Sequence, residues 1–185
     1  MTYPVTVEPF LTASLAALFD DGLPAPQSGE PLPPYWHIAA CATPAVTHAL
    51  GIDGHPLTGI VTPPTDLPRR MFAGGSLRIE RPLIVGERLD HGALVADTTN
   101  KQGRSGPLRF VTVVHSLNRA DGTVAQIDRQ RIVYRGVSDV TATAAGPRAP
   151  QCRRDRVITP GPGGRRGALC ADPVALQRFS AVTSN

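Results

Sequence analysis

The sequence predicts an α+β domain built on an antiparallel sheet. Two runs of alternating apolar and polar residues, 86–98 and 108–117, flank a turn segment at 100–107 that contains Gly, Ser and Pro, a pattern typical of a β-hairpin. A further alternating run follows the turn at 120–123. An Ala-rich segment at 7–19 has apolar residues at helical spacing and is the strongest helix signal.

The sheet is expected to hold four or five strands in sequential order. An earlier strand is predicted at 75–83, where Pro82 suits an edge position or the strand end because proline cannot donate to a ladder. In the second hairpin strand, the residues expected on buried faces are Leu108, Phe110, Val113 and Leu117. The last strand is indicated by Val124, Ile127, Ile132, Val133 and Tyr134.

Shorter elements complete the expected fold. Pro9 fits the first turn of the helix at 7–19. The aromatic and apolar segment 35–41 is predicted to be a strand because prolines flank it, and a helix is the alternative. Near the end of the chain, Asp172 is expected to cap a helix with Pro173 at its first position.

Composition divides the chain into one domain and two smaller pieces. Residues 1–136 hold the predicted sheet and form the expected domain. Residues 137–170 are rich in Pro, Gly and Arg and are expected to be a linker. Residues 171–185 are again expected to form ordered structure. Within the domain, the long irregular stretch at 44–68 is of the kind that forms a lid or a ligand-facing loop.

Charge and composition exclude several classes of function. The net charge is +4, but 18 of the 19 basic residues are Arg and they form no recognisable nucleic-acid-binding module. Anionic ligands such as the phosphates of coenzyme A are compatible with this charge. No apolar run approaches the roughly 20 residues of a membrane span. Three cysteines without metal spacing, and a first segment unlike a secretory signal, predict a cytoplasmic protein that needs no metal.

The residues alone assign no catalytic constellation, because none of the common nucleophile, phosphate-loop or zinc motifs is present. Arg69 and Arg70 precede a small-residue turn at Gly74 and Gly75, which could hold an anionic group close to the backbone. An exposed arginine pair at a strand entry explains the same residues equally well. His37 follows Trp36, the single tryptophan, and such a histidine is more often a packing residue than part of a pocket.

Several ordered blocks nevertheless resemble one family. The chain is similar to the N-terminal half of the MaoC-like, type 2 hydroxyacyl-thioester dehydratases, a group that includes mesaconyl-CoA hydratase-like proteins and dehydratase domains like that of fatty acid synthase. The resemblance covers roughly residues 5–136 and 171–185. It rests on residues 32–37, 67–75, 81–87, 101–113 and 132–135.

This resemblance implies a hot-dog fold, in which an antiparallel sheet wraps around a helix. It also implies an acyl thioester of coenzyme A or a carrier protein as substrate, with no separate cofactor, and reversible hydration of an α,β-enoyl group. A homodimer, or a heterodimer with another hot-dog protein, is expected. A non-catalytic subunit or scaffold, and a pocket repurposed for another reaction, are the alternatives.

The resemblance further suggests which residues bind the thioester: Trp36, His37, Arg69, Arg70, Met71, Gly74, Gly75 and Arg104. In the family the acid/base His and Asp belong to a second hot-dog repeat, on a segment whose start residues 179–185 of this chain resemble. Residues 171–185 would then be the start of a truncated second repeat. The expectation is therefore a hot dog whose second repeat is missing and which hydrates enoyl thioesters slowly on its own. His37 is the only catalytic candidate in the chain itself.

Overall fold

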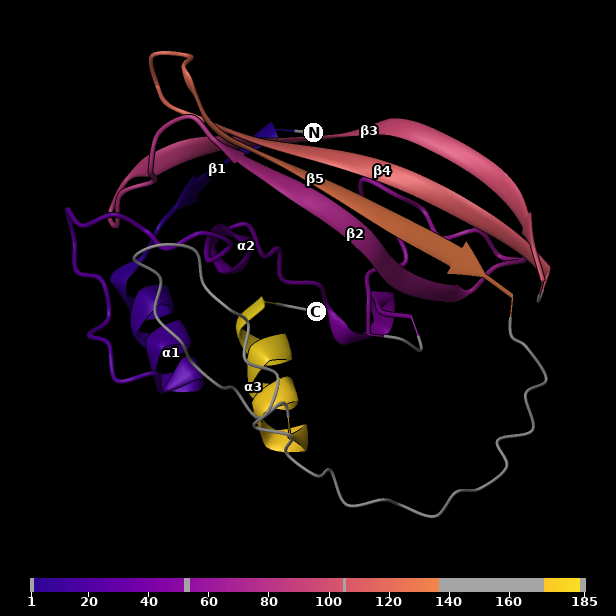
Figure 1. Ribbon diagram of the computed structural model, residues 1–185, viewed down its shortest axis with the longest axis horizontal. Coiled ribbons are helices and arrows are strands. Elements are labelled where there is room, and N and C mark those ends of the chain that lie inside the picture. The colour runs from indigo at the N-terminus through magenta and orange to yellow at the C-terminus, as the bar shows by residue number, and fades with distance from the viewer. Residues whose placement is uncertain (1, 52–53, 105, 137–171, 184–185) are drawn as a thin grey trace.

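One five-stranded antiparallel sheet forms the centre of the structure, a computed structural model that describes residues 2–51, 54–104, 106–136 and 172–183 (Figure 1). In spatial order the strands are β1 (Thr2–Thr6), β3 (Arg88–Gly103), β4 (Gly106–Asn118), β5 (Val124–Arg135) and β2 (Arg69–Ile79). The predicted α+β class is confirmed. The predicted linker at 137–170 lies outside the described residues.

The helices gather on one side of the sheet, which curves over them (Figure 1). They are α1 (Pro9–Phe19), the single-turn α2 (His37–Ala40), the 3₁₀ turn η1 (Thr47–Ala49) and α3 (Pro173–Thr183). Because the helices lie on one side, the sheet has one face turned toward them and an outer face that no described element covers.

Within the described residues, no helix combines the length and the apolar character that a bilayer crossing requires.

The predicted hairpin is confirmed and is longer than expected. β3 and β4 pair from Asp90 opposite Asn118 to Gly103 opposite Gly106, so both strands run into the segment predicted to be the turn. Gly106 has a φ of 113°, a backbone conformation that side chains disfavour. The last strand is also confirmed as β5, which pairs with β4 on one side and β2 on the other.

The edges of the sheet differ from the prediction. β2 begins at Arg69 and ends at Ile79, so it starts six residues before the predicted strand and leaves Pro82 in the following loop. The short edge strand β1 was not predicted, because five residues that include Pro4 carry little strand signal. Proline is tolerated there, since an edge strand has one side without ladder partners.

The prediction of a strand at 35–41 is wrong, and the helical alternative is correct. The segment folds into α2, in which the Cys41 amide donates to the His37 carbonyl at 2.9 Å. A short apolar run cannot be assigned by periodicity alone. The helical turn places His37 and Ala39 in the protein interior.

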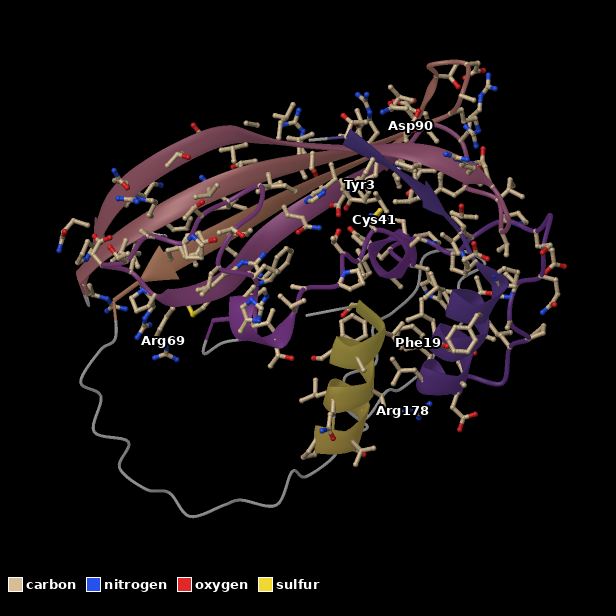
Figure 2. The ribbon with its side chains drawn as sticks, turned by 180° about the vertical axis from the view of Figure 1, so that it is seen from behind. Tyr3, Phe19, Cys41, Arg69, Asp90 and Arg178 are labelled. Atoms are coloured by element: carbon tan, nitrogen blue, oxygen red, sulfur yellow. The ribbon has the colours of Figure 1, made fainter. Side chains whose placement is uncertain are left out.

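Both predicted helices are confirmed. α1 buries Thr12, Leu15 and Leu18, and α3 packs Phe179 and Val182 against the same cluster. Asp172 caps α3 as expected, since its Oδ1 accepts a hydrogen bond from the Ala175 amide at 2.8 Å. The two helices also meet where Arg178 donates to the Ala17 carbonyl at 3.4 Å, near Phe19 (Figure 2).

The largest core cluster lies where β1, β3, β4 and the start of β5 meet the loops beside them. Its members are Val5, Val7, Leu32, Leu83, Val85, Leu89, Leu117 and Ala125. Leu83 is fully buried, and its carbonyl accepts the Leu32 amide at 2.7 Å. This cluster fixes the β2–β3 loop against the sheet.

Replacing Leu83 with Ala should lower the free energy of unfolding by about 2–5 kcal/mol, because the change leaves a cavity in a close-packed cluster. Urea unfolding followed by circular dichroism measures this loss. Leu94→Ala is the matched control, since Leu94 is exposed on β3 and its truncation should cost about 0.5 kcal/mol or less. Similar losses in the two variants would contradict the assignment of the core.

Candidate functional site

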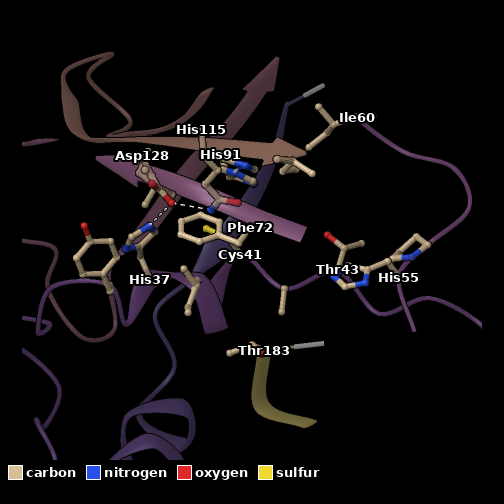
Figure 3. Close-up of a pocket in the computed structure, with 18 of the residues that line it drawn as sticks. His37, Cys41, Thr43, His55, Ile60, Phe72, His91, His115, Asp128 and Thr183 are labelled. Atoms are coloured by element: carbon tan, nitrogen blue, oxygen red, sulfur yellow. Dashed lines mark hydrogen bonds and ion pairs between the residues drawn. The ribbon is translucent and has the colours of Figure 1, made fainter. Parts of the chain in front are cut away.

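A cavity of about 770 Å³ lies between the helix-facing side of the sheet and the chain segments beneath it. All five strands contribute to its wall, with polar side chains from β4 and β5 near its centre, and α2, the loops on either side of it and α3 supply the rest (Figure 3). Apolar side chains form the remaining wall: Ile38, Ile60, Phe72, Leu117, Ile132 and Phe179. The cavity thus combines an apolar surface with a compact group of ionisable side chains.

The polar wall begins with Asp128, which β5 directs toward the helices. His37 on α2 reaches it with Nε2 at 3.3 Å from Oδ2, and Gln130 donates from Nε2 to the same oxygen at 2.8 Å. His37 is 3% exposed and Asp128 5%. Figure 3 shows the imidazole and the carboxylate pointing toward one another across the cavity wall. Two elements that are 91 residues apart in the sequence therefore meet at one carboxylate.

The charge on Asp128 is maintained by its neighbours. Burial acts to raise the pKa of the carboxyl, but the hydrogen bonds from His37 and Gln130 and the electrostatic effect of the His37 side chain outweigh it. The net result is a pKa below the ordinary value for aspartate. Asp128 is therefore ionised at neutral pH although little of it reaches solvent.

Two further histidines lie together on the adjacent strands. His91 of β3 and His115 of β4 share a hydrogen bond of 3.0 Å between Nε2 and Nδ1, and their rings are parallel. Burial is the main cause that lowers the pKa of both, to about 4 for His91. Both rings are thus neutral at pH 7, so one nitrogen of the pair donates and the other accepts.

Tyr3 of β1 closes this side of the cavity. Its ring meets the His91 ring edge to face at 4.8 Å between centroids, and its hydroxyl donates to the Cys41 carbonyl at 3.1 Å. The Cys41 thiol also lines the cavity. Burial, with a smaller effect of the Asp128 charge, raises the pKa of this thiol to about 12. Cys41 therefore stays protonated and is not suited to act as a nucleophile.

Several buried polar atoms of the cavity wall lack a hydrogen-bond partner among the described residues. The described residues contain four such side-chain atoms, and three of them belong to cavity-lining residues: His37 Nδ1, His91 Nδ1 and Gln126 Oε1. Buried polar atoms without partners are rare and costly in folded proteins. No group of three or more His, Cys, Asp or Glu residues in the described part of the chain could hold a metal ion.

The structure brings together half of the residues that the sequence suggested for ligand binding. His37, Arg70, Met71 and Gly75 line the cavity. Trp36 instead packs beside Phe19 at 5.9 Å between ring centroids, and Gly74 follows the bulge in β2. Arg69 and Arg104 are exposed, and Arg69 lies well away from Tyr3 and Cys41 (Figure 2). None of these four lines the cavity.

Sequence reasoning missed Asp128, Gln130 and the pair of His91 and His115. It also placed Phe110 on a buried face of its strand, whereas the buried residues of β4 and β5 include Val111, Gln126 and Asp128. The available signal was the alternation Gln-x-Asp-x-Gln at 126–130. In the sheet, Gln126 lies opposite Leu117 and Asp128 lies opposite His115. Strict alternation along β5 would have turned these polar residues inward together with Ile132 and Tyr134.

The His91–His115 pair makes stability depend on pH. His91 has a pKa of about 4 in the folded protein, against about 6.5 unfolded, so acidification protonates the unfolded chain first. The stabilisation is fully present above pH 6.5 and is lost as the pH falls toward 4. We expect the free energy of unfolding to drop by on the order of 1–2 kcal/mol, after allowance for solvent screening.

Urea unfolding at a series of pH values across this interval tests the expectation. His91→Gln should flatten the decline, because glutamine does not titrate and can still reach His115. His48→Gln changes an exposed histidine of η1 and should leave the pH dependence as in the wild type. Equal slopes for the wild type and His91→Gln would show that this ring does not cause the decline.

Comparison with solved structures establishes the fold. The chain is similar to a MaoC-like dehydratase with a TM-score of 0.60 at 11% identity, covering all of this chain and 65% of that one. It is also similar to HtdX from Mycobacterium tuberculosis with a TM-score of 0.54 at 17% identity, covering 100% of this chain and 63% of that one. The sheet and its helices are those of the hot-dog fold, as the sequence predicted.

Sequence comparison identifies the family. Mesaconyl-C(4)-CoA hydratase from Chloroflexus aurantiacus is 35% identical over 172 residues, which cover 92% of this chain and 57% of that protein. The chain therefore spans little more than half the length of this curated relative. Residues 35–185 match the family described as hydroxyacyl-thioester dehydratase type 2. With that match over most of its length, the chain belongs to the type 2 hydroxyacyl-thioester dehydratase family of hydratases and dehydratases.

Proposed function

We propose that this chain binds an acyl thioester in the cavity under the sheet and takes part in the reversible hydration of its α,β-enoyl group. The observation that carries the proposal is the division of the cavity wall. One part is apolar and suits an acyl chain, and the other holds an ionised carboxylate among histidines and glutamines. The volume of about 770 Å³ lies in the usual range for small-molecule sites.

Hydration of an enoyl thioester needs a base for water, an acid for the α-carbon and hydrogen-bond donors near the thioester oxygen. The polar wall offers groups of each kind within one enclosure. Neutral His91 and His115 keep donors and acceptors there without adding positive charge. The Cys41 thiol, which remains protonated, does not compete as a nucleophile.

The anionic part of the carrier is assigned to the arginine-rich start of β2. Arg70 lines the cavity, whereas Arg69 on the same strand is exposed and Arg104 lies beyond the end of β3. A guanidinium beside the cavity can hold a phosphate of coenzyme A or of a carrier-protein arm through charge-assisted hydrogen bonds. The thioester is the substrate in this proposal, and no other cofactor is required.

A second hot-dog domain is proposed to complete the site, either on a second copy of this chain or on another protein. β2 is an edge strand of the sheet, and its Phe72 is 70% exposed although it lines the cavity. A large apolar side chain so placed suits a covering partner. The Chloroflexus relative has room in its additional length for such a domain.

Arg70→Ala should weaken the binding of crotonyl-CoA roughly tenfold, because a charge-assisted hydrogen bond is lost. Isothermal titration calorimetry measures the affinity. Arg69→Ala, which removes the neighbouring exposed guanidinium, should change it less than about twofold. With crotonyl-pantetheine, which lacks the phosphates, the Arg70 variant should bind as the wild type does. Failure of wild-type protein to bind either thioester at millimolar concentration would exclude the proposed function.

Sedimentation velocity should detect an assembly larger than one chain, because pairing of two hot-dog domains would cover Phe72 and the edge of β2. Phe72→Ser should shift the equilibrium toward the monomer. A matched change at Leu94, exposed on the outer face of β3, should not. A wild-type protein that remains monomeric at every accessible concentration, and that pairs with no second hot-dog protein, would contradict the proposed assembly.

A further inference from the structure

The cavity wall contains a buried carboxylate, Asp128, that accepts hydrogen bonds from His37 and Gln130. We propose that Asp128 is a catalytic general base that activates the water added to the enoyl thioester, and that His37 and Gln130 position it. This inference rests on the proposed function, because it names the acid/base group for the reaction assigned to the same cavity. It differs from the expectation that the acid/base residues belong only to a second repeat.

Asp128 is the one carboxylate among the described residues that line the cavity. Both hydrogen bonds described for it end on Oδ2, from His37 at 3.3 Å and from Gln130 at 2.8 Å. Its other oxygen, Oδ1, is thereby left for a water molecule. Two donors on one oxygen fix the orientation of the carboxylate, and a fixed orientation is what a base needs to meet a substrate held in place.

Asp128 is buried with an imidazole and a side-chain amide as its described hydrogen-bond partners. A buried carboxylate is expensive unless a cation neutralises it. Glu87, for comparison, is paired with the Arg119 guanidinium at 2.6 Å. Asp128 has only an imidazole and an amide, yet its pKa stays low enough for the charged form to persist. A carboxylate that its neighbours keep ionised although it is buried in a cavity is characteristic of functional sites.

The unpartnered atoms around Asp128 supply a second, independent observation. His37 Nδ1, His91 Nδ1 and Gln126 Oε1 are buried without hydrogen-bond partners among the described residues, and all three residues line this cavity. Gln126 lies two residues before Asp128 on the same face of β5. Its carbonyl oxygen can accept one hydrogen of a water whose other hydrogen points to Asp128. The surroundings of the carboxylate thus provide for ordered water.

In the proposed step, Asp128 Oδ1 accepts a proton from water as the water oxygen forms a bond to the β-carbon. The electron pair of the C=C bond moves toward the thioester carbonyl, which becomes enolate-like. The proton held by Asp128 then passes to the α-carbon, and the carboxylate is regenerated. One water is added and no oxidant or reductant is needed. Dehydration is the same sequence in reverse.

The test compares turnover with binding in four variants of the full chain. Asp128→Asn removes the base with little change of shape and should lower kcat for crotonyl-CoA hydration about 10²–10⁴-fold, while the Kd from calorimetry stays within about threefold of the wild type. Asp90→Asn and His48→Gln make the same chemical changes at exposed positions. Both controls should keep the kcat of the wild type.

His37→Gln tests positioning through the pH profile. A base must be ionised to act, so the acid limb of kcat/KM reports the pKa of Asp128 in the free enzyme. Because the hydrogen bond and charge of His37 lower that pKa, the variant should show an acid limb moved to higher pH. A role limited to packing would lower activity without moving the limb. This measurement also decides the matter if Asp128→Asn fails to fold.

The outcomes separate this inference from the proposed function. If wild-type protein binds crotonyl-CoA and Asp128→Asn binds it equally but loses turnover, Asp128 is the base. If wild-type and variant, each assayed in the assembly with the second hot-dog domain, bind equally and hydrate at the same rate, or neither hydrates, the assignment of Asp128 is wrong while thioester binding stands. If the wild type does not bind the thioester, the proposed function fails and the assignment of Asp128 fails with it.

Discussion

The double pairing of β5 is the constraint on which the site depends. β5 is hydrogen-bonded to β4 on one side and to β2 on the other, so its side chains can point only toward the helices or away from them. The helix-facing row runs from Gln126 through Asp128 and Gln130 to Ile132 and Tyr134. One strand therefore places a polar group and an apolar group on the same buried surface. The division of the cavity wall follows directly from this row.

The cavity also shows how several ionisable groups can share a small volume. Only one of them, Asp128, is held in its charged form by its surroundings. Burial keeps His91 and His115 neutral, and burial with the Asp128 charge keeps the Cys41 thiol protonated. Because Asp128 is the single carboxylate among the described lining residues, this charge meets no like charge beside it. It also makes each neighbouring hydrogen bond stronger than it would be in water.

The sequence was most informative where local signals act alone. The helix at Pro9–Phe19, the cap at Asp172 and the long hairpin follow from residue type and spacing over a few positions. It was harder to predict which residues of β4 and β5 face the core. Phe110 and Ile127 have the apolar side chains typical of core residues, but the structure turns Val111 and Asp128 inward. The contact between His37 and Asp128 joins α2 to β5, and only the tertiary fold sets that distance. Family resemblance pointed to the pocket, but not to this pair.

The position of β1 has a practical consequence for work on this protein. Tyr3 touches the His91 ring and donates to the Cys41 carbonyl, so the first strand is part of the cavity wall and not a free tail. An affinity tag fused directly ahead of it would be tethered only a few residues from that wall. Removing the tag with a protease that leaves no added residues keeps the strand in its native register.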